Sequence, residues 1–166
     1  KYRRPLITSL VPTQVLSLID NNFGLRWLQS LAVIWVGGAS IPTDLADKAR
    51  KKSINLAPCY GATETAAMVT CLSPRDFLNG SNSVGFPLED VDIEINNRNL
   101  LKIKTNRIAI SKWQKNKLEP ITNSNGWWEA GDLAKYVTLN NKKALQILGR
   151  RDSAINSGGE TIFPED

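Results

Sequence analysis

Five consecutive residues, Tyr60 to Glu64, carry side chains suited to binding a nucleotide. Tyr60 offers a flat ring on which a base can stack. The loop at Gly61 and Thr63 offers backbone N–H groups and a hydroxyl to a phosphate, and Glu64 offers carboxylate oxygens to a hard cation such as Mg2+. An ordinary strand-to-helix turn, in which Thr63 caps a helix that Glu64 opens, explains the same residue types. Taken alone, these residues favour the capping turn.

Other short motifs change that balance. The Tyr60–Glu64 segment resembles the YGxTE signature of adenylate-forming enzymes, the family of the acyl-CoA synthetases. Further motifs of that family follow in the family's order: Val36-Gly37-Gly38-Ala39, Gly126-Trp127-Trp128 with Gly131-Asp132, and Gly149-Arg150-Arg151-Asp152 followed by Ser157-Gly158-Gly159-Glu160. Ser9 to Gln14 also resembles the SLVPTQ segment of one branch, the 2-succinylbenzoate–CoA ligases of the menaquinone and phylloquinone pathway. The resemblance therefore extends over almost the whole chain.

The resemblance implies a reaction in two halves. A carboxylate attacks the α-phosphate of ATP, with Mg2+ present, and gives an acyl-adenylate and pyrophosphate. Coenzyme A then attacks the adenylate and releases AMP. The first half is an in-line displacement, in which positioning and charge neutralisation do most of the catalysis. Such a reaction fits a chain without histidine, whereas Ser-His-Asp or Cys-His catalysis within it is excluded.

Position by position, the resemblance gives five residues direct roles at the nucleotide. Tyr60 is expected to stack near adenine, Thr63 to contact the phosphates and Glu64 to hold Mg2+. Asp132 is expected to accept hydrogen bonds from both ribose hydroxyls, as a charged acceptor with two oxygens can. Arg150 is expected to bind ribose or phosphate oxygens through its guanidinium fork. Thr63, Glu64 and Arg150 are thus the expected catalytic residues.

A second set of residues would complete the site. The remaining nucleotide-binding positions are Gly37, Gly38, Ala39 and Gly61. The acyl group is expected at Ser9, Pro12, Thr13 and Gly85, the pantetheine arm at Gly158 and Gly159, and the hinge to a small C-terminal domain at Asp152. Several of these positions also have a plain structural explanation, such as a strand-ending turn at Gly37 and Gly38, a proline-started helix at Pro12 and a β-turn at Gly158 and Gly159. The same holds for Asp132, as a solvated turn aspartate, and for Arg150, as a surface arginine.

The chain departs from the family pattern in several ways. Pro58 stands where the family often has a carboxamide, so an adenine contact there must come from backbone, and Ser153 replaces a frequent acidic residue. The family's Gly/Ser/Thr-rich phosphate loop and its C-terminal lysine are not in the sequence. We therefore expect the chain to be a segment of a longer protein and to be inactive by itself.

The residues around these motifs predict an α/β fold that is a fragment of the large adenylate-forming domain. Ile7–Val11, Leu31–Val36 and Ile54–Cys59 are expected strands of a parallel layer, with Leu31–Val36 buried on both faces. Helices are expected to begin at Pro12 and Thr43. The Pro12 helix should end at Asn21-Asn22, and a short helix is expected over Thr63–Leu72, broken by Ser73-Pro74.

From Val91 the hydrophobic period changes to two, which predicts an antiparallel half-solvated sheet. The pattern continues through Leu101, Ile103, Ile108 and Ile110, followed by a polar loop over 114–126 and a hairpin around Asn140-Asn141. The predicted organisation is an α/β part over 1–88, a β-subdomain over 89–149, a hinge at 150–152 and the start of a C-terminal domain over 153–166.

Composition limits the rival interpretations. Hydrophobic residues make up 42% of the chain and charged residues 22%, as in ordinary soluble proteins, and no apolar run is long enough to span a membrane. The net charge of +5 suits nucleotides and coenzyme A, and also a nucleic-acid surface, but the aromatic residues are not interleaved with the basic clusters. Cys59 and Cys71 have neither metal-ligand spacing nor a disulfide framework, and both lie among apolar or small residues, which indicates reduced, buried thiols in a cytoplasmic protein.

We therefore interpret the sequence as part of an acid–CoA ligase, with 2-succinylbenzoate as the acid. The cofactors and partners would be ATP, Mg2+, coenzyme A and a small carboxylic acid, with no nucleic acid. Another aryl- or fatty-acyl-CoA ligase is the alternative within the class, and a non-catalytic nucleotide-binding module is the alternative outside it. The sequence does not reveal the oligomeric state.

Overall fold

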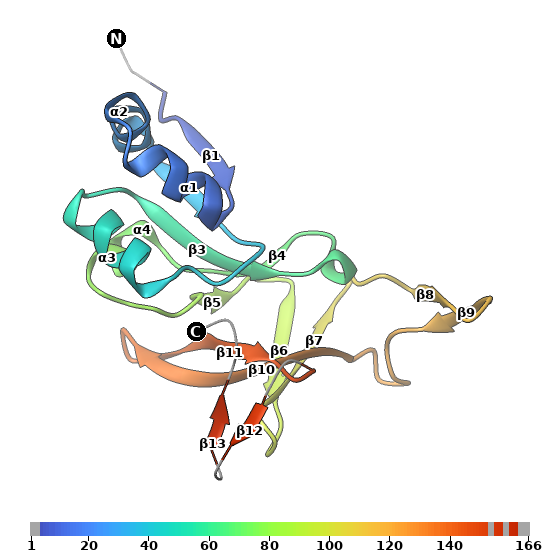
Figure 1. Ribbon diagram of the computed structural model, residues 1–166. Helices are drawn as coiled ribbons and strands as arrows, with labels where there is room; N and C mark the ends of the chain where they lie inside the picture. Colours follow the sequence, from blue (N-terminus) through green and yellow to red (C-terminus); the bar gives the residue numbers. More distant parts are fainter. Residues whose placement is uncertain (1–3, 153–154, 158–159, 163–166) are drawn as a thin grey trace.

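The computed structural model describes residues 4–152, 155–157 and 160–162, and the side chains of the first of these ranges. The predictions for Ser153, Gly158 and Gly159 lie outside these residues. The elements form two main sheets, with helices beside the first and a short two-stranded hairpin that projects away from the second (Figure 1).

The first sheet is a mixed one of five strands. They are β1 (Ile7–Leu10), β2 (Val33–Val36), β3 (Leu56–Gly61), β4 (Met68–Cys71) and β5 (Phe86–Pro87), in that spatial order. β1, β2 and β3 run parallel, whereas β4 and β5 pair antiparallel. The parallel α/β layer predicted for the first part of the chain is confirmed.

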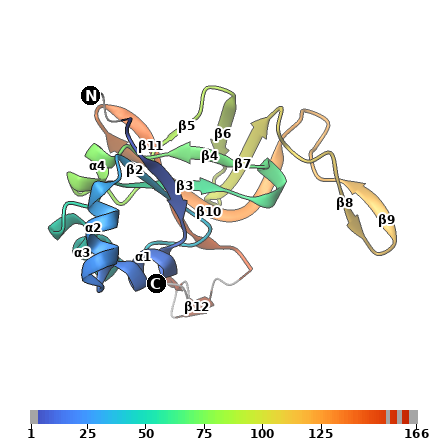
Figure 2. The same ribbon diagram turned by 90° about the horizontal axis from the view of Figure 1, so that it is seen from above.

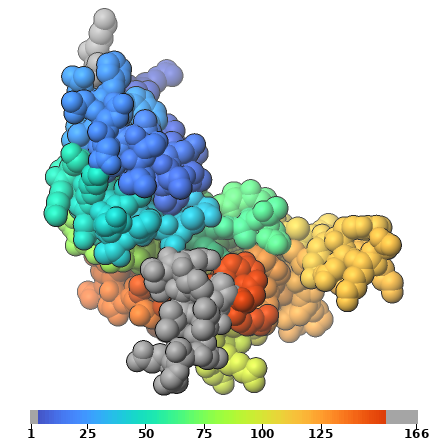
Figure 3. Space-filling model, viewed as in Figure 1, coloured from blue at the N-terminus to red at the C-terminus, as the bar shows by residue number. Residues whose placement is uncertain are grey.

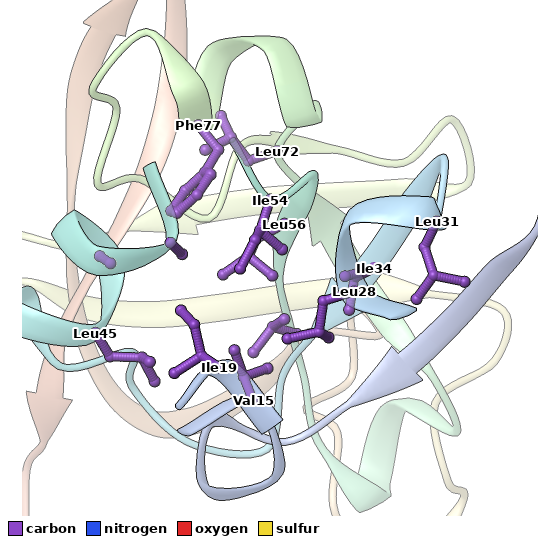
Figure 4. Close-up of a cluster of buried hydrophobic side chains, with 13 residues drawn as sticks. Val15, Ile19, Leu28, Leu31, Ile34, Leu45, Ile54, Leu56, Leu72 and Phe77 are labelled. Carbon is purple, nitrogen blue, oxygen red and sulfur yellow. The ribbon is translucent and has the colours of Figure 1, made fainter. Parts of the chain in front are cut away.

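Four helices pack their apolar sides into one cluster beside this sheet (Figure 4). They are α1 (Pro12–Ile19), α2 (Asn22–Ser30), α3 (Thr43–Lys51) and α4 (Pro74–Leu78). The helices expected at Pro12 and Thr43 are confirmed. α2 was missed, because Asn21 does not simply end a helix: its side chain accepts hydrogen bonds from the N–H groups of Phe23 and Gly24 and so starts the next one.

β2 differs from the expectation of burial on both faces. Ile34 and Val36 are fully buried, but Val33 and Trp35 between them are only half-buried. This alternation arises because the buried side chains face the helical cluster, whereas the intervening ones point to the other face of the sheet.

The helix expected over Thr63–Leu72 is wrong. Thr63–Thr65 forms a single 3-10 turn, after which the chain returns as β4 beside β3. The turn ends at Ala66, whose φ of 60° is incompatible with a continuing helix. Ser73-Pro74 does not break a helix but starts α4, because the Ser73 hydroxyl accepts a hydrogen bond from the Asp76 N–H.

The second sheet is antiparallel, as predicted. Its strands are β6 (Val91–Ile95), β7 (Leu100–Thr105), β10 (Trp128–Leu139) and β11 (Lys142–Arg150), in the order β11-β10-β7-β6. The predicted hairpin joins β10 to β11 through a two-residue turn. Asn140 and Asn141 both have positive φ, at 51° and 59°, as the tight primed hairpin turns require.

A further hairpin occupies much of the expected polar loop over 114–126. β8 (Ser111–Gln114) pairs with β9 (Lys117–Pro120) and projects away from both sheets, as Figures 2 and 3 show. Ile110, expected to continue the buried alternation, is 86% exposed just before this hairpin. A short pair, β12 (Ile155–Ser157) and β13 (Glu160–Ile162), follows β11.

The two sheets share a second buried cluster. Val69 of β4 packs with Leu101, Ile103 and Leu145 of the second sheet. Backbone hydrogen bonds reinforce this junction, since the Val84 N–H donates to Leu145 and the Leu145 N–H donates to Gly85. The last strand of the first sheet ends at Pro87, close to the predicted domain boundary, whose position stays a prediction.

No helix within the described ranges has the length and apolar character needed to cross a bilayer.

The junction gives a stability prediction at Gly85. This residue has a φ of +82°, and an added Cβ would lie 2.0 Å from the backbone oxygen of Cys71. We expect Gly85→Ala to lower the free energy of unfolding by about 3 kcal/mol or more, because both the backbone strain and the clash with rigid main chain must be relieved. Urea denaturation measures this change.

Gly80→Ala is the matched control. Gly80 also has a positive φ, of +97°, but nothing lies within 4 Å of an added Cβ. Only the conformational cost remains, about 1–2 kcal/mol. Equal losses at the two glycines would contradict the close approach at Gly85.

Candidate functional site

The first part of the site is the edge where the parallel strands end. Because β1, β2 and β3 run parallel, their carboxyl ends lie at one edge of the sheet, the usual position of ligands in α/β proteins. Gly37 follows β2 there, with its N–H 3.4 Å from the carbonyl oxygen of Leu10 at the end of β1. A Cβ on Gly37 would lie 2.9 Å from the sulfur of Cys59, so β2 and β3 approach closely at this edge.

Several of the predicted acyl-binding and nucleotide-binding residues lie at this edge. Ser9 is near the end of β1, and Pro12 and Thr13 open α1 immediately after it. Gly38 and Ala39 follow Gly37 in an exposed loop. Ser9 and Thr13 are exposed, whereas Pro12 is buried. Their contact with an acyl group or a nucleotide stays a prediction.

A hydrogen bond joins this edge to the second sheet. The hydroxyl of Tyr60 on β3 donates to Oδ2 of Asp132 on β10 at 2.5 Å, across 72 residues of sequence. Tyr60 is half-buried, and Asp132, at 8% exposed, is the only charged residue that is buried among those the structure describes. The bond fixes the orientation of the Asp132 carboxylate at the junction of the two sheets.

Arg150 lies on the other side of this carboxylate. Asp132 and Arg150 are register partners in the β10–β11 hairpin, and an Arg150 nitrogen lies 3.8 Å from Oδ1 of Asp132. The guanidinium also donates to both oxygens of Asp152, at 2.9 and 3.2 Å. The predicted hinge residue is therefore tied to the predicted ribose site through one arginine.

Burial and these neighbours set the protonation states. Burial raises the pKa of Tyr60 well above its ordinary range, and the hydrogen bond to Asp132 raises it further, so Tyr60 stays a neutral donor. Burial also raises the pKa of Asp132, against the lowering effects of the Tyr60 hydroxyl and of Arg150. The hydrogen bond to Asp152 raises the pKa of Arg150, which stays a cation.

The turn at Thr63 and Glu64 begins two residues after Gly61, the last residue of β3, where Tyr60 also lies. Thr63 is exposed and Glu64 is half-buried. The expected capping by Thr63 does not occur. Instead the buried Thr65 hydroxyl accepts from the Ala62 N–H at 3.0 Å and lies within 2.9 Å of the Ala62 and Ala67 carbonyl oxygens. The Thr65 hydroxyl thus fixes the shape of the turn, which leaves the Thr63 hydroxyl and the Glu64 carboxylate without a structural task in it.

The donor set at this turn suits a magnesium ion that arrives with a nucleotide. Over the part of the chain that the structure describes, no group of three or more Asp, Glu, Cys or His side chains could form a cage for a metal. Mg2+ is commonly held by one or two carboxylates together with substrate phosphates and water. Glu64 beside the exposed Thr63 hydroxyl provides that kind of partial site, and its charge acts on both Tyr60 and Asp132.

Two predicted positions have structural explanations. Gly61 ends β3, and a Cβ there would lie 2.5 Å from the Ala67 carbonyl oxygen, so the returning turn requires a glycine. Position 85 also needs a glycine, because a Cβ there would collide with the backbone of Cys71. Roles for these glycines at a nucleotide or an acyl group stay predictions.

The two cysteines are free and half-buried, facing each other on β3 and β4. Burial raises the pKa of Cys59 to about 11, with a smaller contribution from Cys71. Burial also raises the pKa of Cys71. Both thiols therefore stay protonated and unreactive at neutral pH.

Sequence reasoning missed the contacts that hold the site together. The Tyr60–Asp132 bond joins residues too far apart in the chain for any local pattern to reveal it. The segment after β7 was interpreted only as continuing alternation, yet the N–H of Ala109 donates to the Glu64 carbonyl at 2.7 Å. The sequence held one signal for this contact: the alternating apolar residues change from odd positions up to Ile103 to even positions at Ile108 and Ile110, so the strand pattern breaks near Arg107.

Comparison with protein families matches residues 2–106 to the AMP-binding enzyme family. The 2-succinylbenzoate–CoA ligase of Salmonella typhimurium is 37% identical over 158 residues, covering 95% of this chain and 32% of the relative. The ligase of the same name from Bacillus subtilis is 29% identical over 167 residues, covering 95% of this chain and 33% of the relative. The chain thus spans about a third of the length of the curated relatives it matches.

Solved structures agree with these matches. Wild-type Escherichia coli MenE with a bound analogue of OSB-AMS has a TM-score of 0.73 at 31% identity, over 99% of this chain and 36% of that one. Bacillus subtilis o-succinylbenzoate CoA synthetase in complex with the acyl-adenylate OSB-AMP has a TM-score of 0.79 at 29% identity, over 96% and 34%. The Bacillus subtilis synthetase in complex with ATP and magnesium has a TM-score of 0.77 at 29% identity, over 96% and 34%.

The Tyr60–Asp132 bond gives a pH-dependent prediction. Tyr60→Phe leaves a buried carboxylate without its donor and raises the pKa of Asp132 further in the folded state. We expect a loss of about 1–3 kcal/mol in the free energy of unfolding at pH 7. At pH 4 the loss should be smaller, because an aspartate with a raised folded-state pKa is destabilising only once the pH exceeds its unfolded pKa.

Denaturation of the wild type and the variant at the two pH values measures this difference. Tyr136→Phe is the matched control, since the Tyr136 hydroxyl is exposed and donates to the neutral Ile93 carbonyl. It should cost about 1 kcal/mol or less, with little pH dependence. A Tyr60→Phe loss that is equal at both pH values would show that the bond does not stabilise the Asp132 charge.

Proposed function

The chain belongs to the AMP-binding enzyme family, and we propose that it is part of an ATP-dependent acid–CoA ligase whose acid is 2-succinylbenzoate. The whole protein activates the acid as an acyl-adenylate and then transfers it to coenzyme A. The observation that carries this proposal is the linked trio of Tyr60, Asp132 and Arg150 beside the Thr63–Glu64 turn. The matched relatives are named as 2-succinylbenzoate–CoA ligases, which supports the choice of acid.

Asp132 binds the ribose in this proposal. An ionised carboxylate has about four lone-pair sites on its two oxygens, so the bond from Tyr60 leaves acceptor capacity for two ribose hydroxyls. Tyr60 fixes the direction of the carboxylate and presents its ring to the base. Because the carboxylate is buried, its charge-assisted hydrogen bonds to a ligand are strong ones.

The Thr63–Glu64 turn receives the phosphates. The exposed Thr63 hydroxyl donates to a phosphate oxygen, and Glu64 holds the Mg2+ that accompanies ATP and neutralises its charge. Arg150 lies close to Asp132 and places its positive charge beside the nucleotide. Charge stabilisation of this preorganised kind is the main contribution that a protein makes to phosphoryl displacement.

Asp152 is proposed as the hinge, within a segment over 150–152. Its carboxylate holds the same guanidinium that lies against Asp132, so movement of the chain at this point changes the contacts of Arg150. The proposed organisation keeps an α/β part over 1–88, a β-subdomain over 89–149 and the start of a C-terminal domain over 153–166. The proposed partners are the acid, ATP and coenzyme A, in the cytoplasm, with no nucleic acid.

A substrate panel tests the choice of acid. The full-length protein is assayed for pyrophosphate release and thioester formation with 2-succinylbenzoate, benzoate derivatives and fatty acids. We expect the highest kcat/KM with 2-succinylbenzoate. Good turnover of a fatty acid with none of 2-succinylbenzoate would overturn the choice of acid, and no turnover of any acid would count against ligase activity.

Replacement of Asp132 tests the nucleotide site in the same protein. We expect Asp132→Asn to lower kcat/KM for ATP by roughly 10–100-fold, because a neutral amide replaces a charged acceptor at the ribose. Asp92→Asn, at an exposed position of β6, is the matched control and should leave the value unchanged. Equal activity of both variants would show that Asp132 does not bind the nucleotide.

A further inference from the structure

Arg107, which the nucleotide site does not include, connects the Thr63–Thr65 turn to the second sheet. Its Nη1 donates to the Thr65 carbonyl at 3.2 Å and its Nη2 donates to the Met68 carbonyl at 3.2 Å. On the other side, its Nε donates to Oδ2 of Asp90 at 2.7 Å. One guanidinium therefore bridges the backbone that carries Thr63 and Glu64 and an acidic side chain just before β6.

The two carbonyls bracket an unfavourable piece of backbone. Ala66 lies between them with a φ of 60°, in the left-handed region that residues with a Cβ rarely adopt. The same returning segment packs so closely that a Cβ on Gly61 would meet the Ala67 carbonyl. The turn thus has a strained shape that needs fixed partners, and Arg107 provides two of them.

Asp90, the acidic partner of Arg107, is itself fixed by a second hydrogen bond. Asp90 also accepts a hydrogen bond from the Thr105 hydroxyl at 3.0 Å. Two residues beyond Arg107, the N–H of Ala109 donates to the Glu64 carbonyl at 2.7 Å. The segment Thr105–Ala109 therefore donates hydrogen bonds to three backbone carbonyls in and just after the turn, those of Glu64, Thr65 and Met68.

We infer that Arg107 is a positioning residue that sets the Thr63 hydroxyl and the Glu64 carboxylate for the triphosphate of ATP and its magnesium ion. This inference rests on the proposed ligase function. Arg107 acts through the main chain, because the described bonds of its guanidinium go to two backbone carbonyls and to Asp90. The planar fork matters, since a lysine ammonium cannot reach two carbonyls and a carboxylate with the same fixed geometry.

The full-length protein with Arg107→Ala and with Arg107→Lys tests this role through two measurements. Hydrogen exchange of the amides in 62–68, without ligand, should become at least about tenfold faster in Arg107→Ala, while β11 is unchanged. KM for MgATP should rise about tenfold in the same variant, while KM for the acid stays within about twofold. Arg107→Lys should show both effects to a smaller degree.

Arg98→Ala is the matched control, because Arg98 lies on an exposed turn of the same β-subdomain. It should change neither measurement. Unchanged exchange over 62–68 in Arg107→Ala, or a uniform increase over both sheets, would overturn the inference, as would equal changes in KM for MgATP and for the acid. If the wild type lacks ligase activity, the proposed function fails, and the exchange rates alone still decide whether Arg107 holds the turn.

Discussion

The hydrogen bond from Tyr60 to Asp132 is the contact on which the rest of the site depends. It joins the end of a parallel strand to a strand of the antiparallel sheet, and it lies beside the apolar cluster that the two sheets share. A buried carboxylate is costly unless it is paired and hydrogen-bonded. Tyr60 donates a hydrogen bond to this carboxylate and Arg150 places a positive charge near it, and both contacts favour its ionised form against the effect of burial. They hold a carboxylate acceptor at the junction of the two sheets.

Much of the fold could be predicted because its patterns are local. The proline that starts α1, the polar and apolar faces of α3, and the period-two alternation of β6 and β7 each depend on neighbouring residues only. The failures occurred where tertiary pairing overrode a local pattern. The apolar stretch after Thr65 has enough hydrophobic residues for a short helix, but pairing with β3 and the left-handed Ala66 make it a strand. The β8–β9 hairpin was missed because most of its residues are polar and its two large apolar side chains, Trp113 and Leu118, are exposed rather than part of a buried alternation.

The site was only partly accessible to sequence reasoning. The motifs identified Tyr60, Asp132 and Arg150 as separate matches in one order, and family membership follows from residues 2–106. Their connection through hydrogen bonds and the hairpin register came only from the fold. The Arg107 bridge lies outside every motif, because it acts on carbonyl groups that all residues possess. Contacts to main chain leave no signature in the identity of the residue contacted.

We propose that one nucleotide binds across the junction of the two sheets, and a crystal structure of the full-length protein with AMP would show where it lies. We expect both ribose hydroxyls within hydrogen-bond distance of the Asp132 carboxylate, with adenine against the Tyr60 ring and the phosphate at Thr63. A nucleotide bound away from Asp132, with the Tyr60–Asp132 bond unaffected by its presence, would show that this junction is not the nucleotide site.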